Sequence, residues 1–261
     1  MRQSRQTKYP GVFLHAKHAY MPNNLGYCGP DERGMILEHL HDSKVDEELL
    51  GMLKRFEAAY PFLKMIAKST GREPFDYRVA EAYWIGNSLL DHVQTKDFFE
   101  FAHQGLGKIR KDEAKLLFSK SGALARPHHT FYVLGMYTRN QGELVGDGKL
   151  LQLMDSCRIS WGKVASLDGK RMIVEYTPLR VKDGLLELST PVRKQVSYDS
   201  QIPSFSKVRE GDWVSLHWDF ACERLTQRQL QNLRNYTLAD IKGTNSFVKT
   251  LRRQEQIGRR I

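Results

Sequence analysis

The sequence predicts an α+β fold: an all-α N-terminal domain, then a small β-barrel with a C-terminal helix. Apolar residues recur at steps of three and four through the first 150 residues, which is the helical period. From residue 157 the period changes to two, and short apolar runs are separated by D-G-K, K-D-G and E-G-D turns. We therefore expect a helical domain over residues 1–150, a barrel with its closing helix over 151–240, and a basic tail over 241–261.

The composition is that of a globular protein with free thiols. The 261 residues carry a formal net charge of +10, much of it near the two ends. No window holds eighteen apolar residues, and no signal-peptide pattern follows the basic start. Three cysteines without a CxxC motif fit neither a disulfide framework nor a zinc ribbon. A cytoplasmic protein is expected.

Helices are expected throughout the first part of the chain. The first should stop at Pro22, the second should be capped by Asp31, and the third should break at Pro61. In the fourth, Gly86 and Asn87 are poor helix formers, which suggests close packing or the approach of another group. The expected helical ranges are 12–22, 31–41, 45–68, 76–93, 95–104, 109–119 and 130–136.

Strands are expected where the period is two, and they end at Thr226, a predicted helix cap. In the last strand, alternation places Ser215, His217 and Asp219 on one face, opposite Val214, Leu216 and Trp218. Several short strands with tight turns favour a barrel. The expected strands are 159–167, 171–176, 185–188, 192–198 and 213–218.

Two polar motifs in the first part are candidate functional sites. Cys28 lies in a loop rich in glycine and proline, where a following helix could stabilise its thiolate; a small buried side chain in a tight turn is the alternative. His128 and His129 follow a proline and could offer one imidazole inward as a metal ligand or proton carrier. A structural histidine pair at a helix N-terminus is the alternative. Zinc-protease, P-loop and Rossmann signatures are absent.

Two runs in the second part carry a resemblance to a known family. C-R-I-S-W-G-K-V occupies residues 157–164, and V-R-E-G-D-W-V-S-L-H-W-D-F-A occupies residues 208–221. Over about 80 residues the chain resembles the HypC/HupF hydrogenase-assembly chaperones, which begin with Met-Cys and later carry a G-D-[YW]-V-L-V-H-x-G-F-A run. Two features depart from that pattern: Cys157 is internal rather than near a free N-terminus, and Asp219 stands where the family has glycine.

The resemblance implies a small β-barrel of the HypC type, OB-like, with a C-terminal helix. It implies a carrier of an iron fragment bearing cyanide and CO ligands, with Cys157 and His217 as the metal-binding residues. The implied partners are a metallocofactor-assembly protein or the hydrogenase large subunit. Residues 20–30, Y-M-P-N-N-L-G-Y-C-G-P, also resemble the Y-x-P-N-x-L-G-Y-C-G-P signature of an uncharacterised bacterial and archaeal family, which implies no activity.

Three functions are open at this point. The first is a metal-carrying or metallocofactor-assembly protein, in which the helical domain covers the site or adds Cys28, His128 or His129. The second is an enzyme with a site between the two domains, using Cys28 as nucleophile, His128 or His129 as base, and Glu81 or Asp91 to orient that base. The third is a nucleic-acid-binding module, since a small basic barrel with exposed Trp and Tyr would suit single strands.

Overall fold

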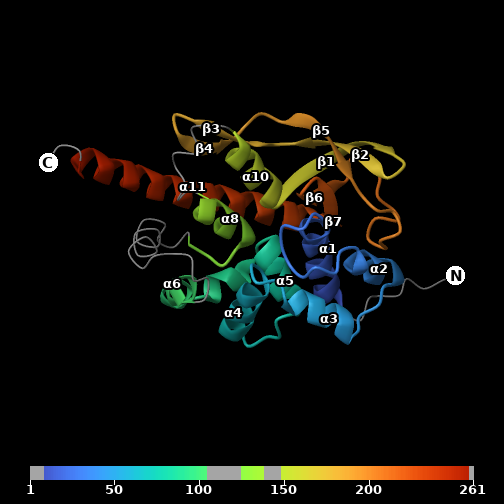
Figure 1. Ribbon diagram of the computed structural model, residues 1–261. Helices are drawn as coiled ribbons and strands as arrows, with labels where there is room; N and C mark the ends of the chain where they lie inside the picture. The colour runs from blue at the N-terminus through green and yellow to red at the C-terminus, as the bar shows by residue number, and fades with distance from the viewer. Residues whose placement is uncertain (1–8, 105–124, 138–147, 259–261) are drawn as a thin grey trace.

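A computed structural model describes residues 9–104, 125–137 and 148–258 of the chain (Figure 1). Helices make up its N-terminal part, as expected, and an expected helix at 109–119 lies outside the described residues. None of the described helices is long and apolar enough to cross a membrane. The helices before the barrel are α1 (Pro10–Asn24), α2 (Met35–Asp42), α3 (Glu47–Lys54), α4 (Tyr60–Thr70), α5 (Tyr77–Trp84), the 3-10 helix η1 (Ser88–His92), α6 (Thr95–Gln104), α8 (His129–Tyr137) and α10 (Lys149–Cys157).

The second part is a closed five-stranded barrel with a separate hairpin. Neighbouring strands around the barrel are β1-β2-β5-β7-β6, and β6 pairs with β1 to close it. The pairing of β3 with β4 forms the hairpin, which lies beside α11. The strands are β1 (Ser160–Asp168), β2 (Arg171–Tyr176), β3 (Leu179–Lys182), β4 (Leu185–Leu188), β5 (Val192–Ser197), β6 (Trp213–His217) and β7 (Phe220–Arg224).

The predicted proline and cap positions are partly wrong. The first helix continues through Pro22, which lies in its last turn, to Asn24. The helix expected over 45–68 is broken near Pro61, but the break lies between Lys54 and Tyr60, and Pro61 itself lies in the first turn of α4, where its missing N–H has no helical partner to lose. The second helix begins at Met35 after Gly34, so Asp31 is not its cap. Thr226 does cap α11, because its hydroxyl accepts a hydrogen bond from the Gln229 backbone N–H at 3.2 Å.

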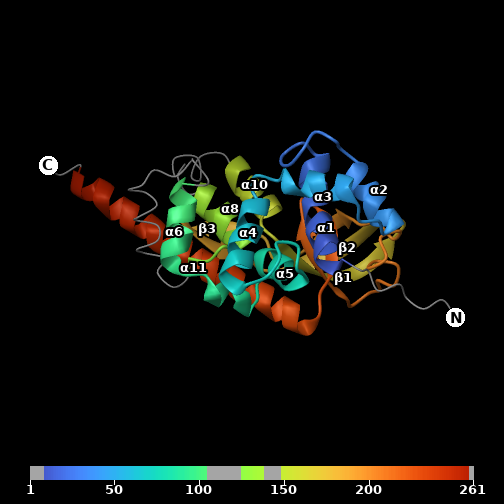
Figure 2. The ribbon, with the colours of Figure 1, turned by 90° about the horizontal axis from the view of Figure 1, so that it is seen from below.

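Helix α1 is buried on every side and joins the two parts of the molecule. It packs against α5 and α2 on one side and against β6 and β7 on the other (Figures 1 and 2). A helix surrounded by protein is expected to be apolar all round, yet α1 also buries four polar side chains. They are His15, Lys17, His18 and Asn23.

The main hydrophobic core crosses the boundary expected at residue 150. It includes Leu53 and Val79 from the helical part together with Val174 and Leu216 from the barrel. A second cluster joins α8 and α10 to the β3–β4 hairpin and to Ile241 on α11. The two parts therefore share their buried apolar surface.

Of the expected basic tail, residues 241–258 form the second half of one long helix. Helix α11 (Gln227–Gly258) begins at the barrel and runs past α8 and the hairpin (Figure 1). Ile241, Phe247 and Val248 are buried, which extends the helix well beyond residue 240. Lys242, Lys249, Arg252 and Arg253 therefore lie on a helix that is packed along one side.

Candidate metal centre

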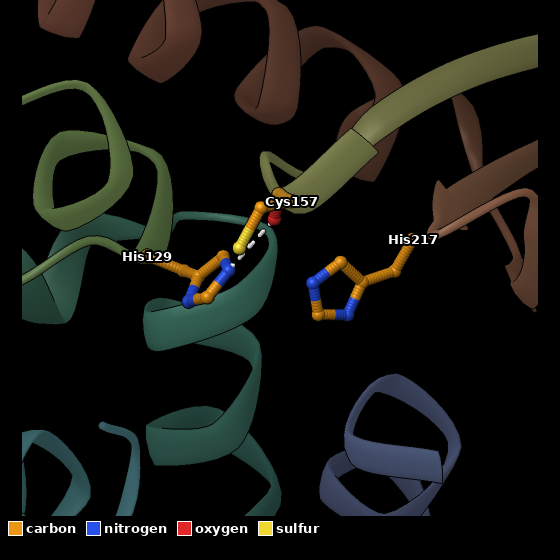
Figure 3. A group of neighbouring side chains, drawn as sticks. All are labelled: His129, Cys157 and His217. Carbon is orange, nitrogen blue, oxygen red and sulfur yellow. Dashed lines mark hydrogen bonds between the residues drawn. The ribbon is translucent and has the colours of Figure 1, made fainter. Parts of the chain in front are cut away.

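Three side chains from separate elements meet where the helical part adjoins the barrel (Figure 3). His129 is the first residue of α8, Cys157 is the last of α10, and His217 is the last of β6. Their potential ligand atoms all lie within 4.8 Å of one another. The structure thus brings together Cys157 and His217, and it adds His129, which the sequence offered only among several alternatives.

His217 presents a free nitrogen to the cluster. Its side chain is 2% exposed, and its Nδ1 donates a hydrogen bond to the His18 carbonyl oxygen at 2.6 Å. Because a carbonyl can only accept, Nδ1 carries the proton and Nε2 carries a lone pair. That Nε2 atom is buried and has no hydrogen-bond partner among the described residues. Burial lowers the pKa of His217 to about 4, so the imidazole is neutral at pH 7.

Pro22 supplies the acceptor that orients His217. In a regular helix the N–H of residue 22 would bond to the carbonyl of residue 18, but proline has no N–H. The His18 carbonyl is therefore left open on α1, and His217 fills it. The proline that was expected to stop this helix instead fixes the ring of a candidate ligand.

His129 is held more tightly than His217. Its Nε2 donates to the Cys157 carbonyl oxygen at 2.9 Å. Its Nδ1 lies 3.0 Å from the Tyr83 hydroxyl, which also lies 2.6 Å from the Ala58 carbonyl oxygen. Burial lowers the pKa of His129 well below its usual value, so this ring is neutral too. Both of its nitrogens are engaged, and the ring must give up one hydrogen bond to act as a ligand.

Cys157 is a neutral thiol in this environment. Burial raises its pKa to about 12, the neighbouring Cys28 adds to that effect, and a weak hydrogen bond from the Trp218 side chain opposes it. Metal coordination by a thiol requires loss of its proton. Binding of a metal at Cys157 would therefore release one proton, while the two imidazoles are already in their ligand form.

The cluster lies in the wall of a cavity of about 680 Å³. Cys28, Tyr27 and Trp218 line the same cavity as the cluster, and Trp84 and Tyr132 complete its aromatic wall. This volume falls in the range of small-molecule sites. It is far larger than a bare metal ion needs.

Cys28 lies in this cavity but not as an activated thiolate. Burial raises its pKa, which fits the alternative of a buried small side chain in a tight turn and not a thiolate stabilised by a helix N-terminus. The following helix begins only at Met35, too far along the chain for its dipole to act on the thiol. Gly29 has φ +87°, and a Cβ there would meet the Phe56 ring at 2.5 Å, which explains the glycine beside this cysteine.

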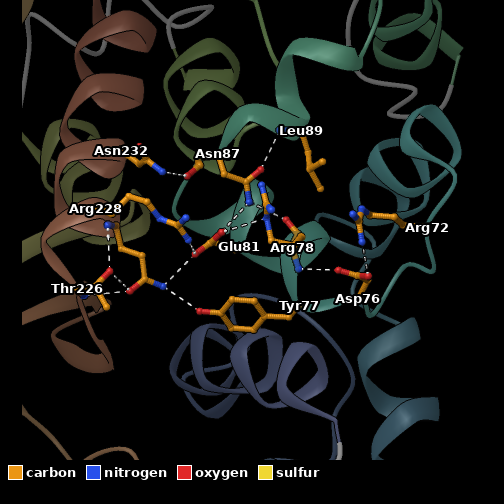
Figure 4. A network of polar contacts seen from close by, with 12 residues as sticks. Arg72, Asp76, Tyr77, Arg78, Glu81, Asn87, Leu89, Thr226, Arg228 and Asn232 are labelled. Carbon is orange, nitrogen blue, oxygen red and sulfur yellow. Dashed lines mark hydrogen bonds and ion pairs between the residues drawn. The ribbon is translucent and has the colours of Figure 1, made fainter.

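The other expected catalytic groups are engaged elsewhere. His128 forms a buried pair with Asp240, Nδ1 to carboxylate oxygen 2.6 Å, and does not line the cavity. Asp91 pairs with Arg126, and Glu81 accepts hydrogen bonds from Asn87 and other groups (Figure 4). Neither carboxylate hydrogen-bonds to His129. Tyr83 occupies the position that the sequence analysis gave to a carboxylate.

The last strand and its turn also differ from the expectation. Ser215 and His217 do share a face, which is buried against α1 through His18. Asp219 instead lies in the turn after β6, where it is exposed and pairs with Lys194. None of the four tryptophans is exposed, which removes one reason for expecting a nucleic-acid surface on the barrel.

The aromatic side chain at the centre of the site, Trp84, was not among the predicted site residues. The Trp84 ring lies 4.6–5.6 Å, centroid to centroid, from four imidazoles, namely those of His15, His18, His129 and His217. His15 and His18 are three apart on a helix that is otherwise apolar, so they share a face. The spacing of His15 and His18 is therefore the feature of the sequence that could have predicted a polar site against this helix.

A second group of potential ligands consists of His39, Asp46 and Glu48. Asp46 caps α3 by accepting from the Leu49 N–H, and it also pairs with Lys44. Glu48 is more than half exposed. These bonds explain the group as a helix cap with surface ion pairs.

Comparison with protein families gives one match, to a family of unknown function (DUF6390), over residues 7–251. This chain belongs to that family. The match spans both the helical part and the barrel. Neither the curated proteins nor the solved structures include a match.

Proposed function

We propose that this protein carries a metal fragment for cofactor assembly and holds it through Cys157 and His217. The observation that supports this most directly is the convergence of the two side chains, with the unpartnered His217 Nε2 directed into a buried cluster. These are the two residues that the resemblance to the HypC/HupF chaperones assigns to metal binding. A buried nitrogen without a hydrogen-bond partner calls for an explanation, and a bound ligand provides one.

The donor set fits iron or another metal that accepts sulfur and nitrogen. Thiolates and imidazoles together suit Zn, Fe and Cu(I) better than Mg or Ca. His217 can bind without rearrangement, and Cys157 can bind after losing its proton. His129 orients the cysteine through the hydrogen bond to its backbone carbonyl. Iron is the metal that the resemblance implies.

The size of the cavity supports a metal that brings ligands of its own. Two or three protein donors leave coordination positions open, and about 680 Å³ of space adjoins them. A structural metal site is normally closed by four protein ligands in a compact shell. An open shell beside a large cavity suits a carrier, which must accept and release a ligated metal.

Two features of the barrel support the HypC-like, OB-like interpretation. Counted in chain order, the barrel strands are arranged 1-2-3-5-4, and the contact between the third and fifth is parallel, as in an OB barrel. Asp219 has φ +57°, a conformation that glycine favours and aspartate tolerates. The aspartate therefore preserves the turn in which the chaperones have glycine.

Metal analysis of anaerobically purified protein tests the proposal. Wild type is compared with Cys157→Ala and with the matched control Cys222→Ala, whose thiol is buried but does not line the cavity. We expect metal in the wild type and the control, and its loss in Cys157→Ala. An infrared scan of the cyanide and CO stretching region identifies a ligated iron. Wild type that is metal-free after expression in cells able to make such ligands would refute the proposal.

A thiol-dependent enzyme is the second candidate, and the cavity favours it. A site of this volume between the helical part and the barrel could hold an organic substrate beside the Cys157 thiol and the His217 lone pair. Such an enzyme would react with a substrate-sized electrophile at Cys157 without metal. Alkylation of Cys157 by iodoacetamide that is unaffected by chelators and faster than that of free cysteine would favour the enzyme.

A further inference from the structure

Trp218 has a backbone conformation that is unusual for a bulky aromatic residue. With Asp219 it forms the two-residue loop between β6 and β7, and its φ is +53°. Such loops normally place glycine, asparagine or aspartate at positions of positive φ. Strained backbone of this kind costs about 1–3 kcal/mol and persists only where surrounding contacts impose it.

Two contacts hold Trp218 against the cavity. Its backbone N–H donates to the Ser156 carbonyl oxygen at 2.8 Å, which ties the turn to the end of α10 beside Cys157. Its indole stacks on the Tyr27 ring, with centroids 4.1 Å apart and planes 15° apart. Tyr27 is 61% exposed, so the pair connects the cavity wall to the surface. The indole is thus fixed at one side of the candidate metal centre.

The indole N–H of Trp218 is buried, and the Cys157 sulfur, a weak acceptor, is the only group that it reaches among the described residues. The indole lines the same cavity as the unpartnered Nε2 of His217, the preceding residue. One is a donor and the other is an acceptor, and each is costly to leave unsatisfied when buried. A ligand that satisfies both must offer a lone-pair acceptor, such as a metal, and a separate hydrogen-bond acceptor.

We propose that Trp218 is a positioning residue whose indole N–H donates a hydrogen bond to a small anionic ligand on the metal held by Cys157 and His217. This inference rests on the proposed function and specifies the kind of cargo. The cavity is much larger than a metal ion, so the cargo has room for ligands that the protein does not supply. An indole can only donate, so it selects ligands with an exposed lone pair, and a charged acceptor strengthens the bond.

Co²⁺ and azide provide a direct test on the full-length protein. Co²⁺ bound to a thiolate gives a sulfur-to-metal charge-transfer band, and azide is then titrated at saturating Co²⁺. We expect the azide dissociation constant to rise about tenfold in Trp218→Phe, which keeps the ring and removes the N–H. The matched control is Trp161→Phe, a buried indole outside the cavity, and it should bind azide as wild type does.

A second measurement avoids any effect of the substitution on folding. In wild-type protein loaded with Zn²⁺, one of the four tryptophan indole N–H resonances should move downfield when azide is added. Unmoved resonances, or equal azide affinity in wild type and Trp218→Phe, would overturn the inference while leaving the metal site intact. Failure of wild type to bind Co²⁺ or Zn²⁺ through Cys157 would instead refute the proposed function, and the inference with it.

Discussion

Two buried polar regions connect the helical part to the C-terminal part, and they differ in how completely they are hydrogen-bonded. Around Glu81 on α5, one carboxylate oxygen accepts from Asn87 and the other from Gln229 on α11 (Figure 4). Around Cys157 and His217 (Figure 3), the Nε2 atom of His217 has no partner among the described residues, and the Trp218 indole N–H reaches only the Cys157 sulfur.

The difference separates a structural network from a site that can take a ligand. The Glu81 carboxylate is saturated by donors that the fold itself provides, so it stabilises the packing of α5 against α11. Beside Cys157, the neutral acceptor His217 Nε2 and the neutral donor Trp218 N–H lack strong hydrogen-bond partners among the described residues, and both residues line the cavity. Other buried atoms without a partner, such as His128 Nε2 and Thr237 Oγ1, do not line the cavity, so it is the combination of unpaired groups with a cavity that distinguishes the Cys157 region.

The largest predicted effect is a loss of stability at low pH, which arises from the buried histidines in and beside the cluster of Cys157 and His217. Burial lowers the pKa of His217 to about 4 and of His15 to about 3, and it lowers those of His18 and His129 as well. The unfolded chain, with histidines near 6.5, binds more protons between these values, so stability falls as pH drops below about 6.5. Urea unfolding followed by fluorescence at pH 7, 6, 5 and 4 measures this. A midpoint that stays constant down to pH 5 would contradict neutral buried imidazoles.

Glu81→Ala is expected to disrupt the polar network around Glu81 and to leave the metal site at Cys157 and His217 intact. It removes one of the two acceptors of each of the buried Asn87 and Gln229 amides, which should cost about 3 kcal/mol of unfolding free energy. The metal content per folded molecule should not change. Chemical denaturation measures the first quantity and metal analysis the second.

The matched control for that variant is Glu187→Ala. Glu187 forms an exposed pair with Arg180 in the β3–β4 hairpin, and such surface pairs contribute about 0–1 kcal/mol. Equal destabilisation by the two substitutions would show that the Glu81 network is not a structural one.

His217→Gln is expected to lower the metal affinity strongly and to change the stability little, which is the reverse of the effect of Glu81→Ala. Glutamine can still donate to the His18 carbonyl but offers the cluster an amide group, which is a poor ligand for metals that prefer sulfur and nitrogen. We expect the Co²⁺ affinity to fall by about 100-fold, with a change in unfolding free energy of about 1 kcal/mol. His41→Gln, a half-buried histidine paired with Asp199 outside the cavity, is the control. Unchanged Co²⁺ affinity in His217→Gln would remove His217 from the site.

Asp219→Gly should have the smallest effect. Glycine relieves the positive φ of the turn but gives up the ion pair with Lys194, so the unfolding free energy should change by less than about 1 kcal/mol. The Co²⁺ affinity should stay within about twofold of wild type. Asp219→Val, which cannot adopt this φ easily, should cost about 1–2 kcal/mol more. Thermal unfolding compares the two, and equal stabilities would contradict the assigned turn.

Most residues of the candidate site could not be predicted from the local sequence pattern alone. The pairing of Cys157 with His217 came from the resemblance, and the structure places them together. His129 joined them because α8 packs against α10, and no spacing in the sequence encodes that contact. Trp218 was assigned to a strand face because alternation was extended one residue too far, into a turn formed by two residues other than glycine.

The sequence by itself determined the local elements and their order. Hydrophobic period distinguished the helical part from the barrel, and β2 and β4 have the predicted limits, because side-chain alternation is a property of the strand alone. β7 was missed because F-A-C-E-R contains no β-branched residue and its hairpin turn lacks the usual signal. Pairing with β6 makes it a strand.

Tertiary structure alone decided which polar groups are satisfied. Pro22 reads as a helix end, yet only the approach of β6 to α1 shows that its missing N–H frees a carbonyl for His217. The same approach buries His217 and lowers its pKa, and the docking of α8 and α10 creates the cavity beside it. Desolvation and hydrogen-bond pairing depend on neighbours that are distant in sequence, so the chemistry of this site exists only in the folded chain.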